Sequence, residues 1–121
     1  MIPPLKATAL TIPNGESLTS AAADCLSVCG LELSGWTSAI ISFAVCRTRD
    51  GTYLPLIDPA TGAEYQIPTP SGVASGVVAV PIKEPALFLN WRYVKVRSGL
   101  VGSPTNQGAA RTVTVLTRPF A

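Results

Sequence analysis

Residues 36–56, WTSAIISFAVCRTRDGTYLPL, hold the pattern that most narrows the possible fold of this chain. Ile41, Phe43 and Val45 alternate with small or polar residues, which is typical of a β-strand whose two faces meet different surroundings. Asp50-Gly51 follows, a pair that favours tight primed turns because glycine tolerates a positive φ. The pattern therefore predicts a β-hairpin, with its turn at 49–52 and its second strand at 52–57.

The rest of the chain predicts more short strands, separated by residues that favour turns. We expect them near residue 17 and at 7–12, 25–33, 64–67, 77–82, 91–97 and 111–118. Residues 84–90 predict one helical turn, and 98–110 predict a long loop. This spacing predicts an all-β fold of eight or nine short strands, arranged as an antiparallel two-sheet, jelly-roll-like β-sandwich, with a small closed barrel as the alternative.

A chain of 121 residues is long enough for one domain with its own hydrophobic core. We assign residues 7–121 to that sandwich domain. We assign residues 1–6 to an extended N-terminal arm, because Pro3 and Pro4 cannot donate hydrogen bonds to a strand ladder. Residues 77–82, VVAVPI, are apolar throughout and predict a strand covered on both faces, with Pro81 requiring an edge or a strand end.

Charged residues are scarce in this sequence, and their scarcity bears on partners. Only 13% of residues are charged, where about a quarter is usual, so we expect uncharged surface that makes contacts in a multimeric assembly. A surface rich in serine, threonine, asparagine and glycine is the alternative explanation. The formal charge of +2 is too small to predict nucleic-acid binding, and no apolar run is long enough to predict a membrane span or a secretory signal.

The sequence offers little for catalysis or metal binding. It has no histidine, which is the commonest general base and metal ligand, and its three cysteines, Cys25, Cys29 and Cys46, lack paired zinc spacing and occupy apolar strand positions. Asp50 and Asp58 lie in predicted turns, where aspartate is favoured because its side chain hydrogen-bonds to the nearby backbone. We therefore predict a protein that is not an enzyme and that holds no metal or cofactor.

Aromatic residues are the candidates for a carbohydrate-binding surface, because tyrosine and tryptophan rings stack on sugars. They are Trp36, Tyr53, Tyr65, Trp91 and Tyr93. Trp91 and Tyr93 share a strand face with Lys95 and Arg97, which describes either an amphipathic binding patch or the aromatic edge of a core with extended cationic side chains over it. We favour the second interpretation.

Four segments taken together resemble small structural proteins encoded by tailed bacteriophages. They are LTIPNGESLTSA, GWTSAIISFAVCRTRDGTYLPLID, GAEYQIP and WRYVKVRSGLVGSPTNQGAARTVTVLTRP, and the resemblance covers residues 7–119. Its motifs are those of a fold rather than of a catalytic site. Residues 46–49, CRTR, are richer in cysteine and arginine than the family pattern, so the end of the hairpin departs from it.

The resemblance implies a β-sandwich virion protein that stabilises the particle, either as a head decoration or cement protein or at the base of a fibre. It implies localisation in the virion after assembly in the host cytoplasm, with the major capsid protein, other virion proteins or further copies of the chain as partners. A carbohydrate- or receptor-binding module on a tail or head appendage is the alternative, and only this alternative requires a glycan. The candidate partner contacts lie in the arm, the hairpin end, the long loop and the C-terminal tail: Ile2, Pro3, Pro4, Arg47, Arg49, Leu100, Val101, Asn106 and Phe120.

Overall fold

The computed structural model describes residues 5–25, 28–37, 39–68 and 76–118. Ile2, Pro3, Pro4 and Phe120, expected to contact partners, lie outside the described residues. The described residues form ten strands and one 3-10 turn. The elements are β1 (Lys6–Ile12), β2 (Ala23–Asp24), β3 (Val28–Ser34), β4 (Ile41–Cys46), β5 (Leu54–Pro55), β6 (Gln66–Ile67), β7 (Val77–Pro81), η1 (Pro85–Phe88), β8 (Tyr93–Leu100), β9 (Ser103–Pro104) and β10 (Arg111–Thr117).

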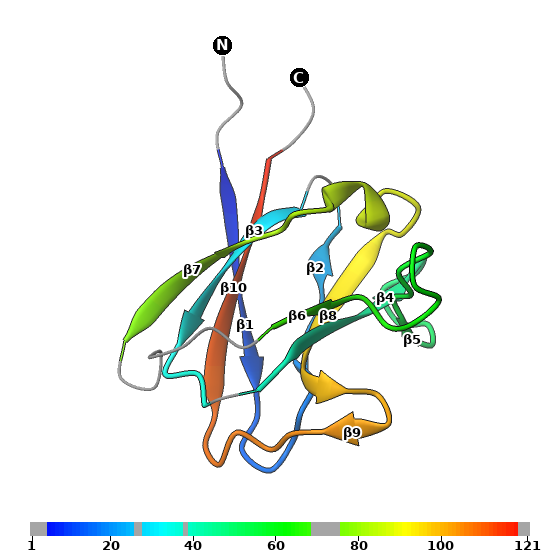
Figure 1. Ribbon diagram of the computed structural model, residues 1–121. Coiled ribbons are helices and arrows are strands. Elements are labelled where there is room, and N and C mark those ends of the chain that lie inside the picture. The colour runs from blue at the N-terminus through cyan, green and yellow to red at the C-terminus, as the bar shows by residue number, and fades with distance from the viewer. Residues whose placement is uncertain (1–4, 26–27, 38, 69–75, 119–121) are drawn as a thin grey trace.

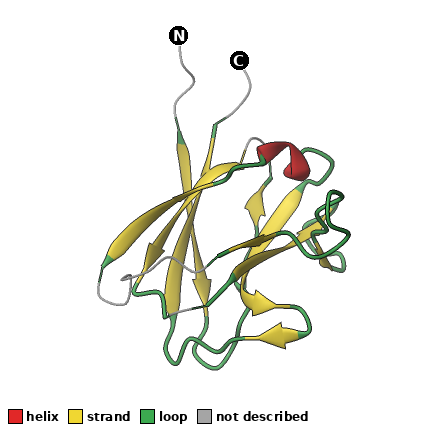
Figure 2. Ribbon diagram, in the orientation of Figure 1, coloured by secondary structure: helices red, strands yellow, loops and turns green. Residues whose placement is uncertain are grey.

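The strands form two antiparallel sheets that pack face to face (Figures 1 and 2). The four-stranded sheet has the order β1-β10-β3-β7. The six-stranded sheet has the order β2-β8-β4-β5, with β6 pairing with β4 and β9 with β8. Both sheets end in edge strands, so they are open and do not close into a barrel. The predicted all-β, antiparallel two-sheet sandwich is confirmed.

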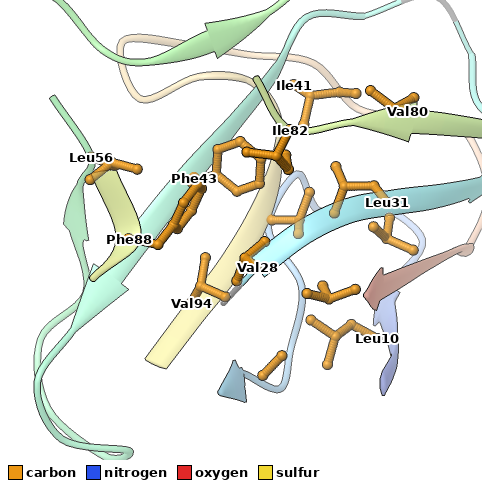
Figure 3. Packing of buried hydrophobic residues seen from close by; sticks show 14 of the residues in the cluster. Leu10, Val28, Leu31, Ile41, Phe43, Leu56, Val80, Ile82, Phe88 and Val94 are labelled. Atoms are coloured by element: carbon orange, nitrogen blue, oxygen red, sulfur yellow. The ribbon is translucent and has the colours of Figure 1, made fainter. Parts of the chain in front are cut away.

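The core fills the space between the sheets and is built from the alternate residues of each long strand (Figure 3). Phe43 on β4 packs edge-to-face with Phe88 on η1, with 5.1 Å between ring centroids, and stacks with Tyr65 at 6.0 Å. Pro85 begins η1 at a position where its missing N–H costs no hydrogen bond, and the turn carries Phe88 into the core. Trp36 is fully buried, and its indole N–H donates to the Ala39 carbonyl at 3.1 Å.

The hairpin of β4 and β5 is present, but its predicted tight turn is wrong. Ala44 pairs with Pro55 and Val45 with Leu54, so a loop of residues 47–53 joins the strands. Gly51 does not have a positive φ. A Cβ at this position would lie 2.7 Å from Cys46 Sγ and closer still to Thr48 Oγ1, so the glycine is needed for space and not for turn geometry.

Two other expectations need correction. The strand at 77–82 is not covered on both faces, because β7 is the edge of its sheet and Val77 is 71% exposed. Residues 98–110 are not one long loop, because β8 continues to Leu100 and turns back into β9. Gly99 permits this turn: it has φ 90°, and a Cβ there would lie 2.6 Å from the Ser103 carbonyl oxygen.

The outer face of the four-stranded sheet is almost without charge. The pairings align its outward positions in rows: Ala7, Leu116, Gly30 and Pro81; Ala9, Thr114, Glu32 and Ala79; Thr11 and Thr112; Ser34 and Val77. Glu32 is the one charged residue among these positions. This face of the sheet is therefore poor in charged residues, as the composition of the sequence predicts for the surface.

We predict that Phe88→Ala lowers the free energy of unfolding by about 3–5 kcal/mol, because it removes a fully buried ring and leaves a cavity beside Phe43. Urea denaturation followed by tryptophan fluorescence measures this change. The neighbouring Leu89 is 51% exposed and provides the matched control, since Leu89→Ala is expected to change stability by no more than about 0.5 kcal/mol. Similar losses in the two variants would contradict this account of the core.

Candidate partner-binding site

The clearest candidate site is a groove on the outer face of the six-stranded sheet. On β8, Val94 and Val96 point into the core, so Tyr93 and Lys95 point to the opposite face. The β4–β5 loop brings Arg49 and Tyr53 over this face, where they contact the two β8 side chains. We call the surface formed by Arg49, Tyr53, Tyr93 and Lys95 the basic groove.

Each cation of the groove lies over an aromatic ring. The Arg49 guanidinium is 4.8 Å from the Tyr93 ring centroid, and the Lys95 ammonium is 4.7 Å from that of Tyr53. Arg92 adds a third cation, 5.7 Å from the Tyr93 centroid. The Tyr53 hydroxyl donates to the Arg49 carbonyl at 2.8 Å, so this hydrogen bond joins the end of the β4–β5 loop to its middle. Cation–π contacts and this hydrogen bond restrict both cations to one place on the sheet.

The groove contains a hollow of about 360 Å³ between two segments that are distant in sequence. Residues 20–22 border it on one side, the β4–β5 loop on the other, and Lys95 lies between them. Asp50 also borders the hollow, but among the described residues no carboxylate forms an ion pair with Arg49 or Lys95. The hollow therefore has an excess of positive charge, which suits a carboxylate or another anionic group.

Arg97 shows what a paired cation looks like on the same strand. Its side chain is 10% exposed, and its Nη1 lies 3.5 Å from Glu64 Oε2. The other oxygen of Glu64 accepts the backbone N–H of Val101 at 3.0 Å. Arg97 and Glu64 thus hold the β8–β9 turn in place, which is a structural role that Arg49 and Lys95 do not have.

The structure brings only one of the predicted contact residues into this groove. Arg49 belongs to it, whereas Arg47 is exposed at the start of the same loop. Leu100 and Val101 lie at the β8–β9 turn, and Val101 is 53% exposed. Asn106 is exposed too, but its side-chain oxygen accepts the Gly108 N–H at 2.8 Å and shapes a turn.

The segment after β9 is tied to the body of the protein by Gln107. The Gln107 amide accepts the Thr37 N–H at 2.6 Å and donates to the Thr37 carbonyl at 2.9 Å and to Ser98 Oγ at 2.8 Å. Gln107 is buried, so these bonds satisfy its polar atoms. These bonds give Gln107 a structural role, while the partner contacts predicted at Leu100, Val101 and Asn106 stay predictions.

Sequence reasoning found the face of β8 but missed the site, because Tyr53, Arg92, Tyr93 and Lys95 were not among the predicted contacts. The alternation in WRYVKVR was a usable signal, since it places Tyr93 and Lys95 on one face. Nothing local indicates that Arg49 and Tyr53 join them across the sheet. Of the aromatic residues considered for sugar stacking, Tyr53 and Tyr93 have a cation over their rings. Tyr65 is buried in the core, and Trp91 is packed against it.

The described residues contain no cluster of three or more potential metal ligands, and all three cysteines are free. Burial, with a smaller contribution from the charge of Asp24, raises the pKa of the Cys25 thiol to about 12. Hydrogen bonding from the Thr48 backbone lowers the pKa of Cys46. Cys25 is completely buried and is therefore a core residue with a thiol that stays protonated at neutral pH.

The fold and the groove together describe a small β-sandwich with two open sheets and a basic groove on the outer face of one of them. Comparison of the chain with protein-family models, with curated proteins and with solved structures found no match. Within the described part of the chain, no helix is long and apolar enough to cross a membrane.

We predict that Cys25 makes the protein less stable as the pH rises from about 9 to 12. The unfolded thiol ionises near its ordinary pKa of 9.0 and the folded one near 12, so between these values the unfolded state binds fewer protons. The stabilisation is complete below pH 9.0 and is lost at up to about 1.4 kcal/mol per pH unit above it. Urea midpoints measured at several alkaline pH values test this slope.

Other groups also titrate in this range, so the comparison of variants decides the matter. Cys25→Ala is expected to flatten the slope, because it removes the buried thiol. Equal slopes in wild type and Cys25→Ala would contradict the assignment.

Proposed function

We propose that this chain is a non-enzymatic structural protein of a bacteriophage particle that binds other virion proteins, in first place the major capsid protein, and stabilises the particle. A head decoration or cement protein fits this role best, and a protein at the base of a fibre is the next possibility. The resemblance of residues 7–119 to small phage structural proteins supports the proposal that the chain belongs to a phage particle. The basic groove is the observation that supports the mode of binding.

The groove has the properties of a surface that binds an acidic segment of another protein. Its two central cations are held on tyrosine rings and have no carboxylate partner among the described residues. Covering such cations with an apolar surface would cost their hydration without return, whereas carboxylates of a partner would compensate it. An acidic loop or strand on the capsid surface therefore fits the groove better than an uncharged one does.

The outer face of the four-stranded sheet supports assembly in a second way. Its aligned rows of alanine, threonine, serine, glycine, valine and proline carry one charge, at Glu32. A surface with a single charge loses little hydration when another protein covers it. The molecule therefore has two faces of different chemistry, one on each sheet, which suits a protein that bridges neighbours in a particle.

Two charge-reversed variants with the same net charge test the groove. Arg49→Glu with Lys95→Glu is expected to weaken binding to particles that lack the chain by at least about tenfold, because two attractive contacts become repulsive. Lys6→Glu with Lys83→Glu changes two exposed lysines elsewhere and is expected to bind like wild type. Sedimentation of the labelled chain with particles, repeated at increasing salt, gives both affinities.

Equal weakening by the two pairs would show that only net charge matters and would contradict the groove as the contact. The broader proposal has its own test, which is mass spectrometry of purified particles from a phage that encodes the chain. Absence of the chain from those particles would overturn the virion assignment whatever the groove binds.

A further inference from the structure

Among the described residues, the backbone groups on the outer edge of β7 have no partner strand, because β3 is the one strand that pairs with β7. Val77 and Ala79 lie between two contacts that fix the pattern: the Gly35 N–H donates to the Gly76 carbonyl and the Ile82 N–H to the Cys29 carbonyl, each at 3.1 Å. The backbone N–H and carbonyl groups of even-numbered residues in this strand therefore point to β3. By the alternation of an antiparallel ladder, those of odd-numbered residues point away from it. Pro81 occupies one of these outward positions, where its missing N–H does no harm.

The two edges of the four-stranded sheet differ in how they are protected. At β1, the Ser20 N–H donates to the outward carbonyl of Thr11 at 3.0 Å, and exposed Lys6 begins the strand. Lysines, prolines and covering segments are the usual means of blocking an edge strand. β7 carries one of them, Pro81, at its end, whereas none lies at Val77–Val80 within the described residues. Val77 is the most exposed of the large hydrophobic residues there, at 71%.

We propose that β7 pairs antiparallel with β7 of a second copy of this chain, around a two-fold axis at Val78. In this register Val77 of each copy lies opposite Ala79 of the other. The outward N–H and carbonyl of Val77 then bond to the outward carbonyl and N–H of the opposite Ala79, and the two-fold axis repeats this pair once. An axis at Ala79 would place Val77 opposite Pro81, and the Val77 carbonyl would then face a residue without an N–H. Pro81 thus favours one register over the other.

A second copy fits this edge because β7 has no charged residue. A two-fold pairing sets identical strands against each other, so any charge on β7 would meet a like charge. The strand VVAVP is uncharged, and its small side chains allow close approach on both faces. The outer faces of the two four-stranded sheets would join into one surface whose outward strand positions carry one charge per copy, at Glu32, and the protected β1 edges would stop growth at the dimer.

This inference does not depend on the basic groove, which lies on the other sheet and stays open in the dimer. The test is the mass of the full chain in solution, measured by sedimentation equilibrium over a range of concentrations. Wild type is expected to be a dimer, and Val77→Lys to be a monomer because it adds a charge to the pairing edge. Val101→Lys adds the same charge at another exposed valine, 53% exposed, and is expected to stay dimeric.

Ala79→Pro provides a second variant, since it removes an outward N–H that the β3 ladder does not use, and it is also expected to be monomeric. Circular dichroism checks that each variant is folded. A monomeric wild type, or a dimer that both substitutions leave intact, would overturn the proposal. A monomeric wild type whose Val77→Lys variant no longer enters particles would assign the edge to a different virion protein, which also overturns pairing with a second copy.

Discussion

The pairing of β4 with β8 is the interaction on which the rest of the structure depends. In its register Phe43 lies beside Val96 and Val45 beside Val94 on the inner face, while Ala44 lies beside Lys95 on the outer one. A slip of one residue would turn Lys95 into the core and Val94 to solvent. The hydrophobic core and the basic groove thus lie on the two faces of one strand pair. A change in the register of this pair would disrupt both.

The two sheets have different outer surfaces because the few charged residues are distributed unevenly. The six-stranded sheet carries Arg49, Arg92 and Lys95 around two tyrosine rings. The four-stranded sheet presents rows of mostly small residues with one charge, at Glu32, and β7 lies at its edge. Electrostatic attraction acts at a distance and orients an acidic partner, whereas backbone pairing and close contact act only after the surfaces meet. The proposed contacts therefore differ in range as well as in partner.

The parts of the fold that were predicted from sequence are those that local chemistry controls. Period-two alternation identified β4, β8 and β10, and Pro85 marked the start of the 3-10 turn. The tight turn at Asp50-Gly51 was wrong, since residues 47–53 form a longer loop in which Thr48 and Cys46 lie close around Gly51. The loop expected at 98–110 was wrong because Gly99 turns β8 back into β9, and because partners distant in sequence, such as Thr37 for Gln107, hold the segment.

The candidate site was less predictable than the fold, since it depends on which strands become neighbours. Arg47 and Arg49 were both expected at a contact, and only Arg49 lies in the groove. The tyrosine beneath it comes from a strand more than forty residues later in the chain. The apolar strand at 77–82 looked buried, because composition cannot distinguish a central strand from an edge strand whose outer face is uncharged.

The sequence by itself determined an all-β chain, because alternation and turn residues act over neighbouring positions. It also determined a surface poor in charge, because composition sets how many charges exist. Only the tertiary structure decided where those charges gather and which edge stays open, because both follow from strand order and from contacts between residues far apart in the chain.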